Sequence, residues 1–519
     1  MNLVLFPVLL PLLGAAILML LRKPGPRLYV AVAIAAATLA VNLTLAVQVF
    51  TDGPVVQTMS NWPAPFGITL IVDGLSAIMI VLSGVVGLLT VFFTHASLHS
   101  GPRKGYGSLL NRARELFGAH ALFQFLFMGV NLSFVTADVF NLFVAFEVML
   151  IASYGLLLLG GELPQLREGL KYVVINLLSS TLFVGAAGLA YGLFGTLNMA
   201  DIAERVALHG PDQRVTAVAL LMALVFATKT ALFPFGFWLP NSYPVPMTAA
   251  SAFFAAMLTK VGAYALIRLF TLMFPEEILA QQIVMGLAGM TVLVGALGAV
   301  ARHRWRYIAS FINVASISMV VIGAMAGTQL GLSAGIYYMI NSVLVVFALF
   351  LIAALAERLS GSNTLKGGHL SLYPWLGVGF FVVTLTMAGL PPTSGFIGKF
   401  AVASSLFALD GWLGTAAAIA VVLSGIILLY AGVQVWMGYF WGDPGKLRKV
   451  RLPRPMVLIT TISVLLVAAL PLVSGPVYDL ATQVAAQLDG NEAYLAAVFP
   501  DGNPALDRTL LPDLMGADR

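Results

Sequence analysis

Apolar runs of about 20 residues recur along the chain, separated by short polar segments that hold most of the charges. A helix of that length crosses the hydrocarbon core of a bilayer. The segment from Asn198 to His209 is too short and polar to span, which indicates an interfacial helix or loop. After about Tyr478 the chain becomes polar, and we expect a polar tail. The pattern predicts about 14 transmembrane helices, which begin near Leu3, Leu28, Asp73, Glu115, Asp138, Arg167, Val215, Val245, Ile278, Trp305, Leu330, Leu372, Leu413 and Pro455.

The composition supports a polytopic membrane protein. Hydrophobic residues make up 60% of the chain and charged residues only 9%, whereas ordinary globular chains carry about 25% charged residues. The net charge of +5 does not indicate nucleic-acid binding, because the basic residues lie in short loops between spans. The absence of cysteine excludes disulfides and thiolate metal sites. His95 and His99 have the spacing of a metal pair, but no further ligand lies close in sequence, so we expect no metal site.

The distribution of charge among the polar segments predicts the orientation of the chain in the membrane. With the N-terminus outside, the inner loops hold 19 of the 27 lysines and arginines, and the spans hold three. The outer segments hold the other five, Arg205, Arg214, Arg268, Arg508 and Arg519. Because Lys and Arg are in excess in cytoplasmic loops, we expect Lys104 and Lys449 inside and both termini outside.

Prolines interrupt two predicted spans at corresponding positions. Pro234 lies in the seventh span, and Pro391 and Pro392 lie in the twelfth. Paired interrupted helices in the two halves of a chain indicate inverted repeats. We therefore predict an all-α polytopic fold with two inverted five-helix repeats, spans 4–8 and 9–13. The predicted divisions are 1–114 for spans 1–3, 115–272 and 273–442 for the repeats, and 443–519 for span 14 and the tail.

Four charged side chains lie inside otherwise apolar spans: Glu147, Lys229, Lys260 and Lys399. A charge at the bilayer centre costs about 2.5–3.5 kcal/mol on insertion scales, so such residues usually mark proton or ion pathways. Proline breaks near Lys229 and Lys399 free backbone carbonyls that need other partners, often water in a cavity. Burial can remove the proton of a lysine near neutral pH, whereas arginine keeps its proton. We predict a proton path over these four residues.

Structural explanations for these charges stay open. Glu147 could serve only as a partner for a neighbouring helix, and its natural partner would then be Lys229. Lys260 and Lys399 could reach the lipid headgroups if they lay near helix ends, although the predicted ends are distant.

Other polar residues near the predicted path give weaker signals. Asp138 starts the fifth span, where a carboxylate also stabilises a helix N-terminus. Ser179 and Ser180 on the sixth span fit a wet path and helix packing equally well, and Tyr154 is similarly ambiguous.

Several long motifs resemble one known family. They are NLFVAFEVMLIASYGLLLLGG, QLREGLKYVVINLLSSTLFVGAAGLAYGLFGTLNMADI, ATKTALFPFGFWLPNSYPVPMTAASAFFAAMLTKVGAYALIR and GLPPTSGFIGKF. From about Leu3 to about Pro471 the chain resembles the D subunit of the Mrp-type multisubunit cation/proton antiporters. That family is similar to the proton-pumping, antiporter-like subunits of respiratory complex I and of membrane-bound hydrogenases. The family pattern has charged residues in the fifth, seventh, eighth and twelfth spans, where this chain has Glu147, Lys229, Lys260 and Lys399.

The resemblance implies an antiporter-like membrane subunit without a redox cofactor, in the cell membrane of a prokaryote. It implies assembly with several other membrane subunits and coupling of inward proton flow to outward sodium flow, as a secondary transporter and not an enzyme. The alternative is a proton-pumping subunit of a complex I-type quinone oxidoreductase or hydrogenase, which needs a peripheral enzyme arm. A third reading is a scaffold that keeps buried charges for helix specificity. The residues alone do not decide which cation moves.

Overall fold

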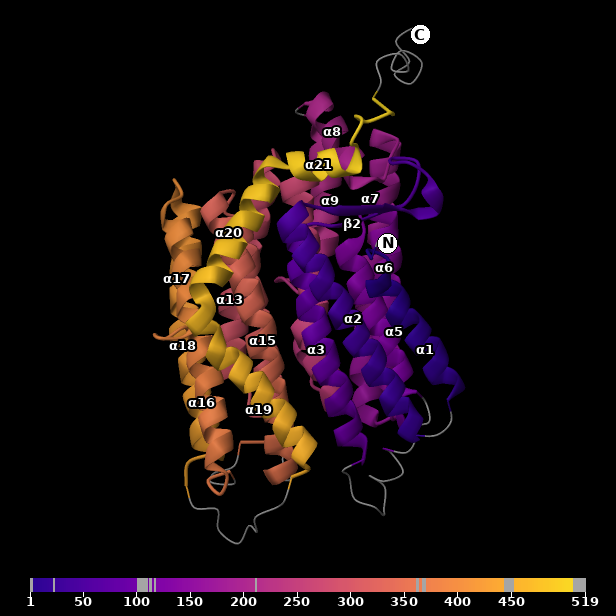
Figure 1. Cartoon of the computed structure of the whole chain (residues 1–519). Coiled ribbons are helices and arrows are strands. Elements are labelled where there is room, and N and C mark those ends of the chain that lie inside the picture. Colours follow the sequence, from indigo (N-terminus) through magenta and orange to yellow (C-terminus); the bar gives the residue numbers. More distant parts are fainter. Residues whose placement is uncertain are drawn as a thin grey trace.

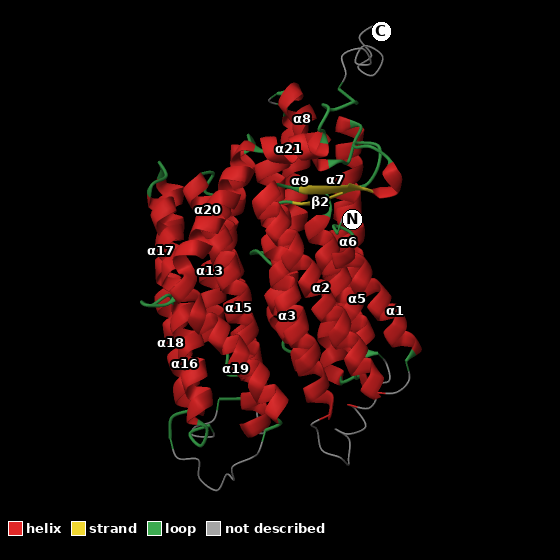
Figure 2. Cartoon of the chain, viewed as in Figure 1, coloured by secondary structure: helices red, strands yellow, loops and turns green. Residues whose placement is uncertain are grey.

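The chain forms a bundle of long helices with a small hairpin at one end (Figure 1, Figure 2). The computed structural model describes residues 3–21, 24–99, 111, 114–115, 118–210, 212–360, 364–365, 370–442 and 452–506. Lys104 and Lys449, which the charge pattern places on the inner side, lie outside the described residues. The prediction of a helical polytopic fold is confirmed in this coarse form.

The elements of the first half precede residue 274. They are α1 (Phe6–Leu20), α2 (Pro24–Asp52), β1 (Val55–Thr58), η1 (Met59–Asn61), β2 (Thr69–Val72), α3 (Gly74–His99), α5 (Ala119–Val135), α6 (Val139–Leu158), α7 (Leu163–Phe194), α8 (Met199–His209), α9 (Gln213–Thr230), α10 (Leu239–Ser242), α11 (Thr248–Phe253), the π-helical η2 (Phe254–Leu258), α12 (Thr259–Arg268) and the π-helical η3 (Leu269–Met273).

The elements of the second half continue the bundle to the C-terminal end. They are α13 (Ile278–Val300), α14 (Trp305–Ala324), α15 (Gln329–Ser360), α16 (Pro374–Ala388), α17 (Ser394–Phe407), α18 (Trp412–Tyr439), α19 (Arg454–Ala469), η4 (Leu470–Val473), α20 (Ser474–Gly490) and α21 (Glu492–Val498).

The described residues contain 11 helical segments long and apolar enough to cross a membrane, and four shorter apolar helices, α1, α5, α16 and α17. The continuous segment from α11 to η3 is fully buried over its most apolar window, and α15 is 94% buried, whereas α2 is only 28% buried. The α11–η3 segment and α15 therefore form the centre of the bundle. Large apolar side chains such as Leu163 and Leu472 are exposed on its outside, as expected for a surface that contacts lipid or partner subunits.

Two helices end abruptly where the prolines stand. Helix α9 ends before Ala231, whose φ of 64° turns the chain, and Pro234 follows in the irregular stretch before α10. Helix α16 ends before Gly389, with φ of 78°, and Pro391 and Pro392 precede α17. Proline cannot continue the hydrogen-bond ladder of a helix, so both breaks follow from the sequence.

Two expectations about the ends of the bundle need correction. An antiparallel hairpin, β1–β2, joins α2 to α3, although only helices were predicted. The segment after Tyr478, expected as a polar tail, is helical, because α20 runs to Gly490 and α21 follows it. Ala481, Val484, Ala485 and Leu488 are buried with helical spacing, so α20 is amphipathic and packs one face on the bundle. The segment 198–209 contains the short helix α8 (Met199–His209), and its position at the interface stays a prediction.

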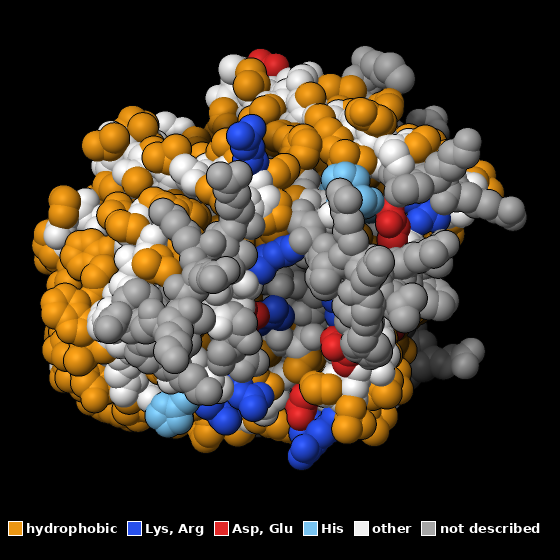
Figure 3. Space-filling model, turned by 90° about the horizontal axis from the view of Figure 1, so that it is seen from below, with side chains coloured by type: hydrophobic (Ala, Val, Ile, Leu, Met, Phe, Trp, Pro, Cys, Tyr) orange, Lys and Arg blue, Asp and Glu red, His pale blue; other side chains and the backbone are white. Residues whose placement is uncertain are grey.

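One end of the bundle is rich in positive charge. Seen from below, Figure 3 shows lysine and arginine side chains from the middle of this end toward its edge, with a few carboxylates among them and hydrophobic side chains over much of the rim. Arg304 and Arg306 line a cavity of about 210 Å³ there, together with Glu162 and Glu357. The opposite end carries the hairpin, α8 and α21 (Figure 1).

Candidate functional site

Lys229 lies in the last turn of α9, directly before the proline break, and only 4% of its surface is exposed. Its ammonium donates to the Asn176 carbonyl at 3.2 Å and to Ser180 Oγ at 3.0 Å, both on α7. It also lies 5.8 Å from the centre of the Phe146 ring, within the range of a cation–π contact. The sequence-predicted Ser180 is therefore a direct partner of this lysine.

Glu147 lies on α6, and the structure does not form the pairing expected between it and Lys229. Among the described residues no ion pair involves Glu147, and its buried Oε1 has no hydrogen-bond partner. The Lys229 ammonium donates instead to acceptors on α7. The opposite charges of Glu147 and Lys229 are therefore not sufficient to make them partners. A buried carboxylate oxygen without a partner is a natural place for water.

Lys260 is completely buried near the start of α12, immediately after the π-helical turn η2. Its ammonium donates to the Ala255 carbonyl of that turn at 2.9 Å and to Asn313 Oδ1 of α14 at 2.8 Å. The other amide atom, Asn313 Nδ2, is buried without a partner. Single π-helical turns inside α-helices often occur at functional sites.

Asn313 was not predicted, because an uncharged residue in an apolar helix attracts little attention. One signal did exist in the sequence. Asn313 follows Arg304 by nine residues, as Glu147 follows Asp138 by nine, and Asp138 and Arg304 precede helices of the same length, 20 residues.

Lys399 lies in α17, just after the second break. Its ammonium donates to the carbonyl of Ala388, the last residue of α16, at 3.1 Å. The C-terminal carbonyls of a helix lack partners within the helix and attract positive charge. Lys399 also lines a mostly apolar cavity of about 270 Å³ between the break and α18, with exposed Phe400 and Ile426 at its edge.

The four predicted residues do not touch one another through any described ion pair or hydrogen bond. Two of their helices, α9 and α12, nevertheless pack closely. A Cβ at Gly262, two residues beyond Lys260, would lie 2.6 Å from Thr230 Oγ1, next to Lys229. Glycine therefore permits the close contact between α12 and α9 that brings the first two lysines into one region.

The weaker candidates Asp138, Tyr154 and Ser179 have different surroundings in the structure. Asp138 caps α6, because its Oδ1 accepts from the Asn141 N–H at 2.7 Å, which is the structural role considered for it. Tyr154 packs edge-on against Tyr172, with ring centres 5.4 Å apart. Ser179 is buried, but its hydroxyl has no partner in the described part of the chain.

A second buried charge cluster was missed, because Arg268 was assigned to an outer loop. Arg268 is instead 2% exposed at the end of α12 and forms an ion pair with Asp73, which precedes α3. Its guanidinium also contacts the hydroxyls of Tyr264 at 3.1 Å and Ser76 at 3.2 Å. Burial alone would raise the pKa of Asp73, but the adjacent guanidinium and the hydrogen bonds lower it below its ordinary value.

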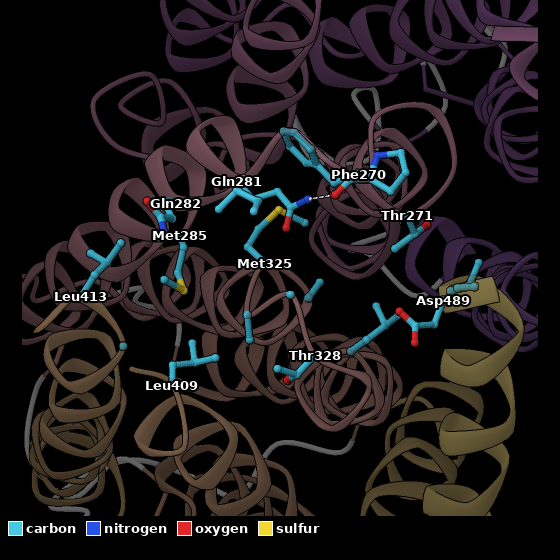
Figure 4. Close-up of a pocket in the computed structure, with 18 of the residues that line it drawn as sticks. Phe270, Thr271, Gln281, Gln282, Met285, Met325, Thr328, Leu409, Leu413 and Asp489 are labelled. Atoms are coloured by element: carbon cyan, nitrogen blue, oxygen red, sulfur yellow. Dashed lines mark hydrogen bonds between the residues drawn. The ribbon is translucent and has the colours of Figure 1, made fainter. Parts of the chain in front are cut away.

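The cavity in Figure 4, of about 410 Å³, lies away from the predicted path. It opens between η3, α13 and α20, and Gln281 at its edge donates to the Pro275 carbonyl. None of the four predicted charges lines it. Within the described ranges no group of three His, Asp or Glu could hold a metal ion. The rings of His95 and His99 stack on each other in the last turns of α3, with their centres 4.0 Å apart.

Comparison with known proteins adds independent information. Residues 136–426 match the family described as NADH:quinone oxidoreductase/Mrp antiporter, TM. The D subunit of the Na⁺/H⁺ antiporter of Alkalihalophilus pseudofirmus is 37% identical over 513 residues, covering 96% of this chain and 100% of the relative.

Two solved structures share the fold over nearly the whole chain. A chain of the Mrp complex from Dietzia sp. DQ12-45-1b has a TM-score of 0.86 at 26% identity, covering 96% of this chain and 99% of that one. A chain of respiratory complex I from Thermus thermophilus with bound NADH has a TM-score of 0.77 at 24% identity, covering 94% and 99%.

Proposed function

The chain belongs to the NADH:quinone oxidoreductase/Mrp antiporter family of transmembrane subunits, and we propose that it is the D subunit of a multisubunit Na⁺/H⁺ antiporter. The observation that carries this is the likeness to a protein of that name over almost the full length of both chains. The buried lysines on α9, α12 and α17, together with Glu147 on α6, whose Oε1 is buried, supply the chemistry that such a subunit needs. It is a transporter subunit that works with other membrane subunits.

We propose that the fold contains 14 spans and two inverted repeats. Counting α1 and α5 as spans, and α16 with α17 as one broken span, adds three to the 11 long segments. Helices α6 and α14 both have 20 residues, and α7 and α15 both have 32. Isolated bridges join positions 138 and 198 and positions 304 and 364, each pair 60 residues apart. These correspondences support a repeat of the same unit, with the arginine-rich end on the inner side.

We propose that protons move between Glu147, Lys229, Lys260 and Lys399, with water in the gaps. Each lysine is buried, is close to a break or a π-helical turn, and donates to a main-chain carbonyl. The partnerless atoms Glu147 Oε1, Ser179 Oγ and Asn313 Nδ2 lie along this series and offer hydrogen bonds to water.

Sodium-driven proton flux in vesicles that contain the assembled complex tests this proposal. We expect flux from the wild type, loss of flux with Lys260→Ala, and intact assembly in both. Lys171→Ala is the matched control, since Lys171 is a half-exposed lysine that pairs with Glu168 on the surface of α7. Absence of sodium-dependent flux from the wild-type complex, or full flux from Lys260→Ala, would overturn the proposal.

A further inference from the structure

A cluster of three buried hydroxyls lies between α14 and α15. Ser316 Oγ of α14 donates to Ser342 Oγ of α15 at 2.8 Å. The hydroxyl of Tyr338, one turn before Ser342 on α15, lies beside Ser316. All three side chains are at most 5% exposed. Since buried hydroxyls in an apolar bundle need partners, three that converge at one point indicate a specific arrangement.

The hydroxyl cluster adjoins the surroundings of Lys260 on one side and of Lys399 on the other. On its Lys260 side, Ser316 follows Asn313, the partner of Lys260, by three residues, so both lie on the same face of α14. On the other side, a Cβ at Gly398, the neighbour of Lys399, would lie 2.8 Å from Tyr338 Cδ2. The ring of Tyr338 therefore reaches the helix turn that carries Lys399.

A second contact ties α17 to this region. Ser394 Oγ, at the start of α17, donates to Asn341 Oδ1 at 2.8 Å, and Asn341 directly precedes Ser342. Along the described helices α14, α15 and α17, the charged residues other than Lys399 are Arg306, Glu357 and Arg358. These three lie at the arginine-rich end of the bundle, so they leave an uncharged stretch between the two lysines.

Hydroxyl groups suit this position because each can accept a proton on a lone pair and release its own. One O–H bond forms as another breaks, so the hydroxyl is unchanged after the transfer. An amide can orient water but does not exchange protons in this way, so Asn313 and Asn341 act as positioning residues. Resting on the proposed function, we propose that Ser316, Tyr338 and Ser342 form the link over which a proton passes, with water, between Lys260 and Lys399.

Substitutions that differ only in a hydroxyl test this link in the assembled complex. Ser342→Val and Ser342→Thr have nearly the same shape, so any strain affects both, while only threonine keeps the hydroxyl. We expect Ser342→Val and Tyr338→Phe to lower sodium-driven proton flux about tenfold or more, comparable to one lost hydrogen bond in the transfer path, and Ser342→Thr to restore most of it. Ser318→Ala is the control, because that buried hydroxyl on α14 donates to Val314 of its own helix.

The outcomes separate the link from the proposed function. If Ser342→Val and Tyr338→Phe transport at the wild-type rate while Lys260→Ala does not, the link is wrong and the function stands. Equal loss in Ser342→Thr and Ser342→Val, with assembly intact, also contradicts the link, since the hydroxyl then makes no difference. No sodium-driven flux from the wild-type complex means that the proposed function itself fails.

Discussion

At the scale of single residues, the hydrogen bonds of the buried lysines are the informative feature. Lys229, Lys260 and Lys399 each donate to a main-chain carbonyl, and no described ion pair joins any of them to a carboxylate. A carboxylate within contact distance favours the charged ammonium strongly. A carbonyl accepts a hydrogen bond from the ammonium and from the neutral amine alike. These contacts hold each lysine in place in either protonation state.

Lys229→Arg tests whether the lysine carries a proton. Arginine can donate to the same acceptors, but it keeps its proton at any working pH. We expect Lys229→Arg and Lys229→Ala both to lose sodium-driven proton flux in vesicles, while the complex still assembles. Transport at the wild-type rate by Lys229→Arg would show that Lys229 is not a proton carrier.

Asp73→Leu tests the buried ion pair at the start of α3. Removing one partner of a buried pair leaves the other charge uncompensated, which typically costs about 3–5 kcal/mol. We expect a lower unfolding temperature of the purified complex, measured by thermal unfolding in detergent. The control is Asp212→Asn, which disrupts an exposed pair with Arg214 and should leave that temperature unchanged.

The pKa of Asp73 also sets a pH range for this stabilisation. Because the folded-state pKa lies below the ordinary value, the contribution is present at neutral pH. It is lost only on acidification through the lowered pKa. An effect of Asp73→Leu that disappeared already between pH 8 and 6 would contradict this assignment.

The sequence singles out charged candidate residues more readily than uncharged ones. Glu147, Lys229, Lys260 and Lys399 stand out because a charge in an apolar run has a large energetic cost. Asn313 has no comparable cost, so only its position relative to Arg304 indicated it. The partner of Lys229 depends on how α6, α7 and α9 pack, and Ser180 could be named only as one of several polar neighbours.

At the scale of elements, the proline-rich stretch after the first break depends on one arginine. Arg306 of α14 donates to the carbonyls of Pro244 at 3.1 Å and Pro246 at 3.2 Å. It also donates to Thr248 Oγ1 at 2.9 Å and pairs with Glu357 at 2.6 Å. Prolines offer carbonyls but no N–H groups, so an irregular proline stretch has an excess of acceptors. A guanidinium, with five donors, satisfies this excess.

Arg306→Met should therefore destabilise the stretch between α10 and α11. Buried acceptors left without partners cost about 1–3 kcal/mol each. We expect a lower unfolding temperature and faster proteolysis near Pro244, measured on the purified complex. Arg304→Met is the matched control, because Arg304 is exposed two residues earlier. Equal effects of the two substitutions would show that loss of positive charge, and not the carbonyl contacts, is responsible.

Most of the elements follow from simple features of the sequence; the β1–β2 hairpin and α20 do not. The apolar runs predict the long helices, and Pro234, Pro391 and Pro392 predict the breaks. Helix α20 was missed because only one face of it is apolar, with Ala481, Val484 and neighbouring residues against the bundle. A uniform hydropathy criterion detects helices that are apolar all round and overlooks those that are apolar on one side.

At the scale of the whole molecule, the positive end of the bundle gives a direct test of orientation. The chain has no cysteine, so a single introduced cysteine can be labelled with an impermeant reagent. Arg304→Cys lies at the arginine-rich end and Glu492→Cys at the end that carries α21, and both side chains are exposed. We expect labelling of Glu492→Cys in intact cells and of Arg304→Cys only in inverted vesicles. The reverse result would overturn the orientation.

The side of the bundle near Lys399 bears on the need for partner subunits. The cavity beside Lys399 ends among exposed apolar side chains, including Phe400 and Ile426. We expect the purified chain alone to catalyse no sodium-dependent proton flux in vesicles, whereas the assembled complex does. Antiport by the chain reconstituted alone, at the rate of the complex, would count against this expectation.

The carbonyl partners of the three lysines also bear on how such a protein can diverge. A point substitution can delete a carboxylate or a hydroxyl, but every amino acid brings the same main-chain oxygen. The acceptors at positions 176, 255 and 388 are therefore inherited with the backbone path. Side chains around the lysines can be substituted, which can change the transport rate or the ion preference. The main-chain acceptor of each lysine is kept. Only an insertion or deletion near a break or π-helical turn would displace that acceptor.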